Sequence, residues 1–222
     1  MTVVAANDQM TRRARPPTVS RDEVVAASLR LIERVGVRRF TMRGLADELN
    51  TAKMTPYYHI GSKQKLLELA ANAMFDQLEL PTPDVARWQE QLREANIAFR
   101  TLLRRYPGMA AYASSREVPG GRRFTVWYMD LMRLAGFQPE IAAGALPVLR
   151  GLVVADLDET YKRSRAGALG PRRAMETTMP DADRWSATFW KELEGESETW
   201  FERGLDQTIR ALRRQLEAPI ET

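Results

Sequence analysis

The chain has 222 residues, of which 44% are hydrophobic and 28% charged, a composition typical of a soluble globular protein. It contains no cysteine and one histidine, which excludes disulfides, a cysteine nucleophile and a zinc finger. No apolar run approaches the roughly 20 residues that a membrane span needs, and no signal-peptide pattern opens the chain. We therefore expect a cytoplasmic protein with no membrane association, no cofactor and no bound metal.

The net charge of +4 is unevenly distributed. Residues 1–65 hold 12 Lys/Arg against 6 Asp/Glu, whereas residues 66–222 hold 21 against 23. A basic front part on a slightly acidic body indicates a polyanion partner for the front part alone. A solvated basic tail would give the same imbalance, so charge does not decide between them.

The first 18 residues combine three arginines with a Pro-Pro pair and few large apolar side chains, which is typical of a flexible basic arm. This arm either follows a DNA minor groove or stays solvated. Ser20, in capping-box spacing with a glutamate, begins a helix that ends at Gly36. Thr41 caps a second, short helix that ends near Asn50, a residue that tolerates positive φ. A third short helix covers about 52–59.

Ser62 caps a long helix that we expect to run to about Leu80, where two prolines begin the second part of the chain. An apolar stripe then recurs at steps of three and four residues: Trp88, Leu92, Ala95, Phe99, Leu102 and Tyr106. Further helices are predicted at about 121–135, from Pro139 to Leu157 and beyond, and near the C-terminus, with a mobile loop at about 164–183. No strand pattern is present, so the predicted fold class is all-α.

Two short helices joined by a tight turn and preceded by a supporting helix form a helix-turn-helix pattern. The stretch FTMRGLADELNTAKMTPYYHIGSKQKLL resembles the DNA-binding domain of the tetracycline-repressor (TetR) family. The matching positions are Thr41, Leu45-Ala46, Tyr57, His59, Ile60, Lys63 and Leu66-Leu67. WQEQLREANIAFRTLLRRYPG and WFERGLDQTIRALRRQL are similar to the ligand-binding domain of its tetracycline-repressor branch.

The resemblance implies a three-helix DNA-binding domain at 19–66, a linker helix at 62–80, and a helical ligand-binding and dimerisation domain at 82–222. It implies a homodimeric regulator that binds a palindromic double-stranded operator. The function that the resemblance favours is a repressor that a small-molecule effector releases from DNA. A helical adaptor that binds only protein is the alternative, but it leaves the basic front part unexplained. An enzyme is not expected, since the chain lacks a cysteine, a G-x-S-x-G motif and a phosphate loop.

The resemblance places nine residues at the DNA: Thr41, Arg43, Lys53, Met54, Thr55, Tyr57, Tyr58, His59 and Lys63. Lys53 and Met54 are expected to open the recognition helix and to face the major groove, Lys53 as a donor and Met54 against a thymine methyl group. Arg43 is placed to reach a base edge or a phosphate. Thr41 begins a helix whose free N–H groups suit a phosphate, and Thr55, Tyr57 and Lys63 would also hold phosphates. For Arg43 and Met54 the alternative is an ordinary exposed side chain. His59 is expected to be structural or adjacent to a phosphate.

Two departures from the family pattern affect the turn and the recognition helix. Pro56 stands where an apolar residue with an N–H is usual, so the helix either starts late or is bent. Asn50-Thr51 replaces the usual Gly-Val of the turn, which asparagine tolerates because it accepts positive φ.

The second domain is rich in aromatic residues and methionine, which suits an effector with a largely apolar or aromatic surface. The predicted pocket residues are Phe99, Tyr106, Tyr112, Phe124, Trp127, Tyr128 and Met132, with ordinary core packing as the alternative for each. A magnesium–tetracycline effector is not expected, because this domain has no histidine and carries Leu78 and Glu79 where one would stand. Asp156, Asp158 and Glu159 are read as a solvated helix end. The predicted dimer interface is Leu152, Val153, Leu205, Ile209 and Leu212.

Overall fold

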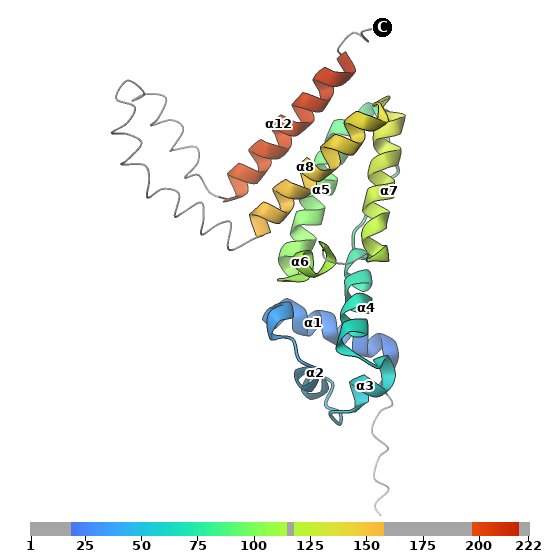
Figure 1. Ribbon diagram of the computed structural model, residues 1–222, viewed down its shortest axis with the longest axis vertical. Helices are drawn as coiled ribbons and strands as arrows, with labels where there is room; N and C mark the ends of the chain where they lie inside the picture. Colours follow the sequence, from blue (N-terminus) through green and yellow to red (C-terminus); the bar gives the residue numbers. More distant parts are fainter. Residues whose placement is uncertain (1–18, 115–117, 158–196, 218–222) are drawn as a thin grey trace, which may run out of the picture.

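The computed structural model describes residues 19–114, 118–157 and 197–217, and every regular element within these ranges is a helix (Figure 1). Helices α1 to α3 form a small group at one end, and α5 to α8 with α12 form a larger bundle at the other, with α4 between them. The all-α prediction is confirmed. The predicted arm 1–18, the predicted loop 164–183, and Asp158 and Glu159 lie outside the described residues. None of the described helices is long and apolar enough to cross a membrane.

Side-chain caps fix where the first helices begin, as the sequence predicts. The Ser20 hydroxyl accepts the Glu23 N–H at the start of α1 (Arg21–Arg39), and the Glu23 carboxylate accepts the Ser20 N–H at 2.7 Å. These bonds lower the pKa of Glu23 below its usual value. Thr41 and Ser62 cap α2 (Met42–Glu48) and α4 (Lys63–Phe75) in the same manner. Each hydroxyl satisfies one N–H group that the first helical turn would otherwise leave without a partner.

Gly36 interrupts α1, as predicted, but one more turn follows before the helix ends at Arg39. Its φ of 74° is strained for any residue with a side chain. A Cβ atom added there would also lie 3.3 Å from the Pro107 carbonyl oxygen. The next residue, Val37, donates its N–H to that same oxygen at 2.9 Å. The bend in α1 therefore brings the first domain against the Pro107-Gly108 turn of the second.

Helix α4 ends at Phe75, five residues before the predicted end at Leu80. The chain tightens after Phe75 through a bond from the Leu78 N–H to the Phe75 carbonyl at 3.0 Å, and Leu78 is buried. Beyond it, the Pro81 carbonyl accepts the Trp127 indole N–H at 2.6 Å. After Phe75 the chain is thus held by a local turn and by a tertiary contact with α7, not by a further helical turn.

The second domain contains η1 (Val85–Arg87), α5 (Trp88–Arg105), α6 (Met109–Ser114), α7 (Pro119–Leu134), α8 (Pro139–Leu157) and α12 (Ser197–Glu217). The predicted stripe on α5 is confirmed as its inner face, since all six residues are buried or packed against the core. Helix α6 was not predicted, because six residues are too few to show a periodic pattern.

A buried ion-pair cluster joins α5 to α8. The carboxylate of Asp156 accepts two bonds from Arg100, at 2.8 and 3.0 Å, and two from Arg104, at 3.1 and 3.3 Å. The Asp156 side chain is fully buried, and the Arg100 guanidinium stands 4.3 Å from the ring centre of Phe201 on α12. The reading of Asp156 as part of a solvated helix end is therefore wrong. Two arginines one turn apart on α5 balance its charge. The sequence alone does not show that they meet α8.

Replacing Asp156 by asparagine is expected to lower the free energy of unfolding by about 3–5 kcal/mol, because the carboxylate between two arginines is lost inside the protein. The matched control is Asp206→Asn, which breaks a half-exposed pair between Arg93 and α12. That change should cost about 1 kcal/mol or less. Urea unfolding followed by circular dichroism measures both. Equal, small effects would contradict a structural role for the buried cluster.

Candidate functional site

The recognition helix of the helix-turn-helix is α3 (Thr55–Ile60), which begins later than the predicted residue 52. Met54 is its N-cap, and Pro56 lies in the first turn, where a missing N–H breaks no helical bond. Pro56 therefore marks a late start and not a bend. Lys53 and Met54 stand in the turn that leads into α3, which corrects the prediction that they open the helix.

Large side chains protrude from this turn and helix. Met54 is 69% exposed, Tyr58 88% and Tyr57 39%, while Pro56 is the buried residue of α3. Large apolar groups held in water at one end of a molecule are typical of a contact surface. The turn before them depends on Asn50, whose φ of 50° gives the left-handed conformation that the sequence predicts.

Two predicted DNA-contact residues, Arg43 and Lys53, are exposed. Within the described residues neither takes part in an ion pair or a side-chain hydrogen bond, so their charges remain available to a polyanion. His59 instead packs edge-on against the Tyr58 ring at 5.4 Å between centroids, in keeping with a structural role. Thr55 is partly buried in the first turn of α3.

Lys63 and Thr41 have partners within the domain. The Lys63 ammonium donates to the Phe40 carbonyl at 2.7 Å and stands 5.6 Å from the centre of the Phe40 ring. The Thr41 hydroxyl accepts the Gly44 N–H at 3.0 Å. Lys63 thus holds the start of α4 against the loop before α2, a positioning role that the sequence reading did not foresee. An ammonium has three protons, so this bond leaves others for a phosphate.

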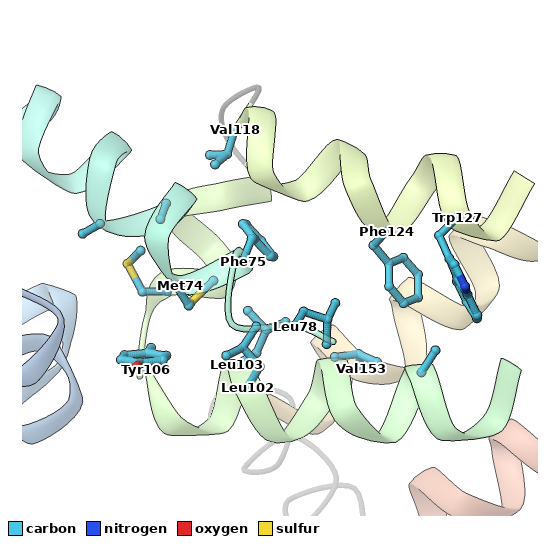
Figure 2. Packing of buried hydrophobic residues seen from close by; sticks show 14 of the residues in the cluster. Met74, Phe75, Leu78, Leu102, Leu103, Tyr106, Val118, Phe124, Trp127 and Val153 are labelled. Carbon is cyan, nitrogen blue, oxygen red and sulfur yellow. The ribbon is translucent and has the colours of Figure 1, made fainter. Parts of the chain in front are cut away.

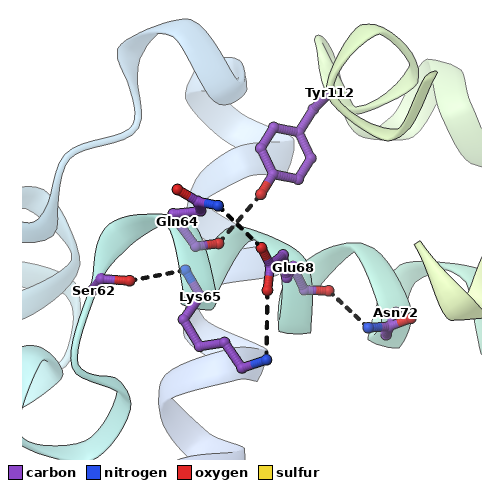
Figure 3. Close-up of polar contacts among 6 residues, drawn as sticks. All are labelled: Ser62, Gln64, Lys65, Glu68, Asn72 and Tyr112. Atoms are coloured by element: carbon purple, nitrogen blue, oxygen red, sulfur yellow. Dashed lines mark hydrogen bonds and ion pairs between the residues drawn. The ribbon is translucent and has the colours of Figure 1, made fainter. Parts of the chain in front are cut away.

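Helix α4 connects this surface to the second domain through polar contacts at two points, and Figure 3 shows the one with Tyr112. Near its start, the Gln64 carbonyl accepts the Tyr112 hydroxyl of α6 at 3.2 Å. About two turns on, the Asn72 side chain accepts the Gly120 N–H of α7 at 2.7 Å. A Cβ atom at Gly120 would lie 2.9 Å from Phe75, so α7 approaches α4 too closely for any larger residue.

A cavity of about 330 Å³ lies between α4, α5, α6, α7 and α8. It is lined by Phe75, Phe99, Leu103, Ala110, Ala113, Val118, Gly121, Arg122, Phe124, Thr125, Arg150 and Val154. Figure 2 shows Phe75, Leu103 and Phe124 approaching the same region from α4, α5 and α7. Ring centroids are 6.1 Å apart for Phe75 and Phe99 and 4.9 Å apart for Phe99 and Phe124, with nearly parallel planes. The cavity therefore has an aromatic wall, one member of which belongs to α4.

Of the seven predicted pocket residues, Phe99 and Phe124 line this cavity and five do not. Each of the four non-lining aromatic residues places its polar end on a group elsewhere in the fold. Their partners are Gln77 for Tyr106, Gln64 for Tyr112, Pro81 for Trp127 and Ala142 for Tyr128. Burial raises the pKa of Tyr128 to about 12, which keeps its phenol protonated as a donor. Met132 is fully buried core.

The sequence reading also missed several lining residues. Phe75 was assigned to the linker helix, although its large apolar side chain at the end of α4 was a usable signal. Arg122, Thr125 and Arg150 were passed over because charged and polar residues on amphipathic helices usually face water. Arg150 crosses from α8 to α7, where its guanidinium donates to the Thr125 hydroxyl.

The predicted dimer residues divide between the core and an open groove. Val153, Leu205 and Ile209 are buried within the single chain, because α8 and α12 pack their most apolar faces against α5 and each other. These three side chains belong to the core of the protomer, and the dimer interface itself stays a prediction. Leu152 and Leu212, the latter as buried as Ile209, line a groove of about 470 Å³ between α8 and α12, together with Ala145, Val148, Gly204, Gln207, Thr208, Ala211 and Gln215.

Comparison with known proteins agrees with this arrangement. Residues 24–70 match the family described as "Bacterial regulatory proteins, tetR family", and residues 80–216 match "Tetracyclin repressor-like, C-terminal domain". The chain belongs to the TetR family. It is therefore a DNA-binding transcriptional regulator, and the adaptor alternative is not supported.

Individual relatives of this TetR-family chain cover most of its length. Tetracycline repressor protein class G of Vibrio anguillarum is 26% identical over 204 residues, which are 90% of this chain and 96% of that protein. A class A repressor from transposon 1721 in Escherichia coli is 33% identical over a match that spans 66% of this chain and 70% of that protein. An HTH-type transcriptional regulator of Saccharopolyspora erythraea is 34% identical, but the match spans 47% of this chain and 44% of that protein.

Solved structures of ActR from Streptomyces coelicolor share the fold. The apo form superposes with a TM-score of 0.72 at 26% identity, covering 92% of this chain and 98% of that one. The complex of ActR with actinorhodin gives a TM-score of 0.69 at 26% identity, covering 88% of this chain and 97% of that one.

Replacing Arg43 by alanine in this TetR-family regulator is expected to weaken operator binding by about 1–3 kcal/mol and to relax base preference. Lys63→Ala should weaken binding to all DNA sequences alike. It should also reduce the slope of log affinity against log salt concentration by about one unit. Arg133→Ala, which removes an exposed charge on α7, is the control and should change neither. Binding to the DNA upstream of its own gene and to a scrambled duplex, over a salt series, measures all three. Unchanged affinity and preference in Arg43→Ala would show that the contact is misassigned.

Proposed function

We propose that this protein is a homodimeric repressor that binds operator DNA through α3 and leaves it when a small molecule occupies the cavity. The observation that carries the proposal is the position of Phe75. Its side chain lines the cavity, and it is the last residue of α4, the helix that is separated from α3 by only two residues. A ligand in contact with Phe75 therefore touches the same rigid element that holds the recognition helix.

A second connection supports the same coupling. Ala110 and Ala113 of α6 line the cavity, and Tyr112, between them, bonds to Gln64 in the first turn of α4. A ligand that displaces α6 would thus also act on the DNA-binding end of α4. Solved complexes of ActR with actinorhodin and (S)-DNPA support a small-molecule role for the corresponding domain here.

A homodimer formed through the groove between α8 and α12 completes the proposal. Val148 is 52% exposed there, and the α8–α12 crossing is so close that a Cβ atom at Gly204 would lie 2.8 Å from Leu152. Two helices with an exposed apolar seam would form a four-helix bundle with a second copy about a two-fold axis. Such a dimer would present two recognition helices roughly 34–36 Å apart, one turn of DNA.

The protein would act without a catalytic step of its own, and in the cytoplasm, where a bacterial operator is located. A ligand can release the operator only through its preference for the conformation that does not bind DNA. About 5.5 kcal/mol of preference is needed to move a population from 99:1 to 1:99.

The proposed function is tested by a gel shift with DNA from upstream of the protein's own gene. The purified protein is expected to retard this duplex but not a scrambled one. Tyr58→Ala, which removes the most exposed large side chain of α3, should weaken the complex, whereas Met129→Ala, which removes an exposed large side chain of α7, should not. Equal retardation of both duplexes by the wild-type protein would contradict sequence-specific operator binding.

Dimerisation is tested with a matched pair of valines. Light scattering at micromolar concentration should return twice the 25.3 kDa chain mass for the wild-type protein. Val148→Glu is expected to give monomers, because it places two charges in the apolar seam of the dimer. Val126→Glu, at a position 57% exposed on α7 and outside the groove, should remain a dimer. A monomeric wild-type protein, or a dimeric Val148→Glu, would contradict the proposed interface.

A further inference from the structure

The cavity has one polar side, and that side is positively charged. Arg122 and Thr125 come from α7 and Arg150 from α8, whereas the remaining lining residues are apolar or glycine. No Asp or Glu is among the lining residues that the structure describes. A ligand in this cavity therefore lies beside the Arg150 guanidinium, and the described lining offers it no carboxylate.

Arg150 is the better defined of the two. Its guanidinium donates to the Thr125 hydroxyl, a neutral acceptor, and within residues 19–114, 118–157 and 197–217 it forms no ion pair. A guanidinium carries five N–H donors in a planar fork, so one bond to a hydroxyl leaves most of its donors for another acceptor. Carboxylates and other planar anions match that fork with two parallel bonds.

The aromatic part of the cavity lining favours flat rings. Phe75, Phe99 and Phe124 form a continuous stack from α4, α5 and α7, with interplanar angles of 13° and 28° between neighbours. Aromatic rings gain from offset stacking or edge contacts with such a wall beyond simple burial of area. At about 330 Å³ the cavity is near the lower end of ligand pockets, which suits a compact ring system.

We propose that the effector is an aromatic anion, with its rings against the Phe99–Phe124 wall and its carboxylate or phenolate oxygen on Arg150. This assignment rests on the proposed effector-binding role of the cavity and specifies its chemistry. The sequence alone suggests a largely apolar or aromatic effector, and the polar lining adds an anionic group to it. A purely apolar effector would remove water from Arg150 and Thr125 without replacing its hydrogen bonds. A cationic effector would meet like charge. An aromatic anion gives Arg150 a hydrogen-bond acceptor and also places rings against the phenylalanine wall.

The test compares three ligands of nearly the same shape on the full-length protein. 2-Naphthoate carries the anion, methyl 2-naphthoate is its neutral ester, and 2-naphthylmethylammonium is the cation. Calorimetric titration is expected to show the acid binding at least about tenfold more tightly than the ester, and the cation more weakly than either. Since the three share one ring system, the ratio reports the charged contact and not the aromatic wall.

Substitutions test whether the preference for the acid over the ester depends on Arg150. Arg150→Gln should reduce the acid-to-ester ratio to about one, and Arg150→Lys should restore part of it by keeping the charge without the planar fork. Arg133→Gln, an exposed arginine on α7 paired with Asp130, is the matched control and should keep the full wild-type ratio. A fall in stability alone would weaken acid and ester equally, so the ratio separates a binding contact from a structural one.

Equal affinity of the wild-type protein for acid and ester, or binding of none of the three at millimolar concentration, would overturn the assignment. Operator binding is measured on the same samples without ligand. Intact operator binding combined with equal affinities refutes the aromatic anion but leaves the repressor proposal standing. Absent operator binding combined with a tenfold preference refutes the repressor proposal and leaves the cavity chemistry standing.

Discussion

The close approach between the end of α1 and the turn after α5 is the constraint on which communication in this fold depends. Val37 donates to the Pro107 carbonyl, and glycines at positive φ stand on both sides of the contact, at Gly36 and Gly108. A Cβ atom at Gly108 would lie 3.2 Å from the Val37 side chain, so neither backbone could approach so closely with a larger residue. Because α6 begins directly after this turn and lines the cavity, the DNA-binding domain rests on one wall of the ligand site.

Helix α4 supplies the second route between the two ends of the molecule. Its first residue, Lys63, is fixed to the loop before α2, and its last, Phe75, lines the cavity. In between, Asn72 binds the first turn of α7, so α4 is held at both ends and at an intermediate point. The buried cluster around Asp156 keeps α5 and α8, two further walls, in register. A stiff helix held between two sites transmits a displacement at one to the other, whereas a flexible linker would absorb it.

Local chemistry was predictable from the sequence, and tertiary placement was not. The caps at Ser20, Thr41 and Ser62, the turn at Asn50 and the stripe on α5 each depend on residues within a few positions, and the structure confirms them. The family resemblance added the domain order. Apart from the bounds of α3 and α4 and the short helix α6, the differences from prediction involve side chains whose partner lies far away in sequence. Examples are Asp156 with Arg100, Trp127 with the Pro81 carbonyl, and Val153 inside the protomer. Periodicity separates an inner from an outer face, but it does not say whether an inner residue lines a cavity, fills the core or meets a second copy.

The central claim is that the cavity and the DNA surface are coupled, and reciprocity tests it most directly. If an aromatic acid weakens operator binding by some factor, the operator must weaken binding of that acid by the same factor, because the coupling free energy belongs to both sites. The measurement is the affinity of 2-naphthoate for the free protein and for the protein saturated with operator duplex. A lower affinity is expected for the complex, by a factor equal to the loss of operator affinity at saturating acid. An acid that binds the free and operator-bound protein equally well would contradict it.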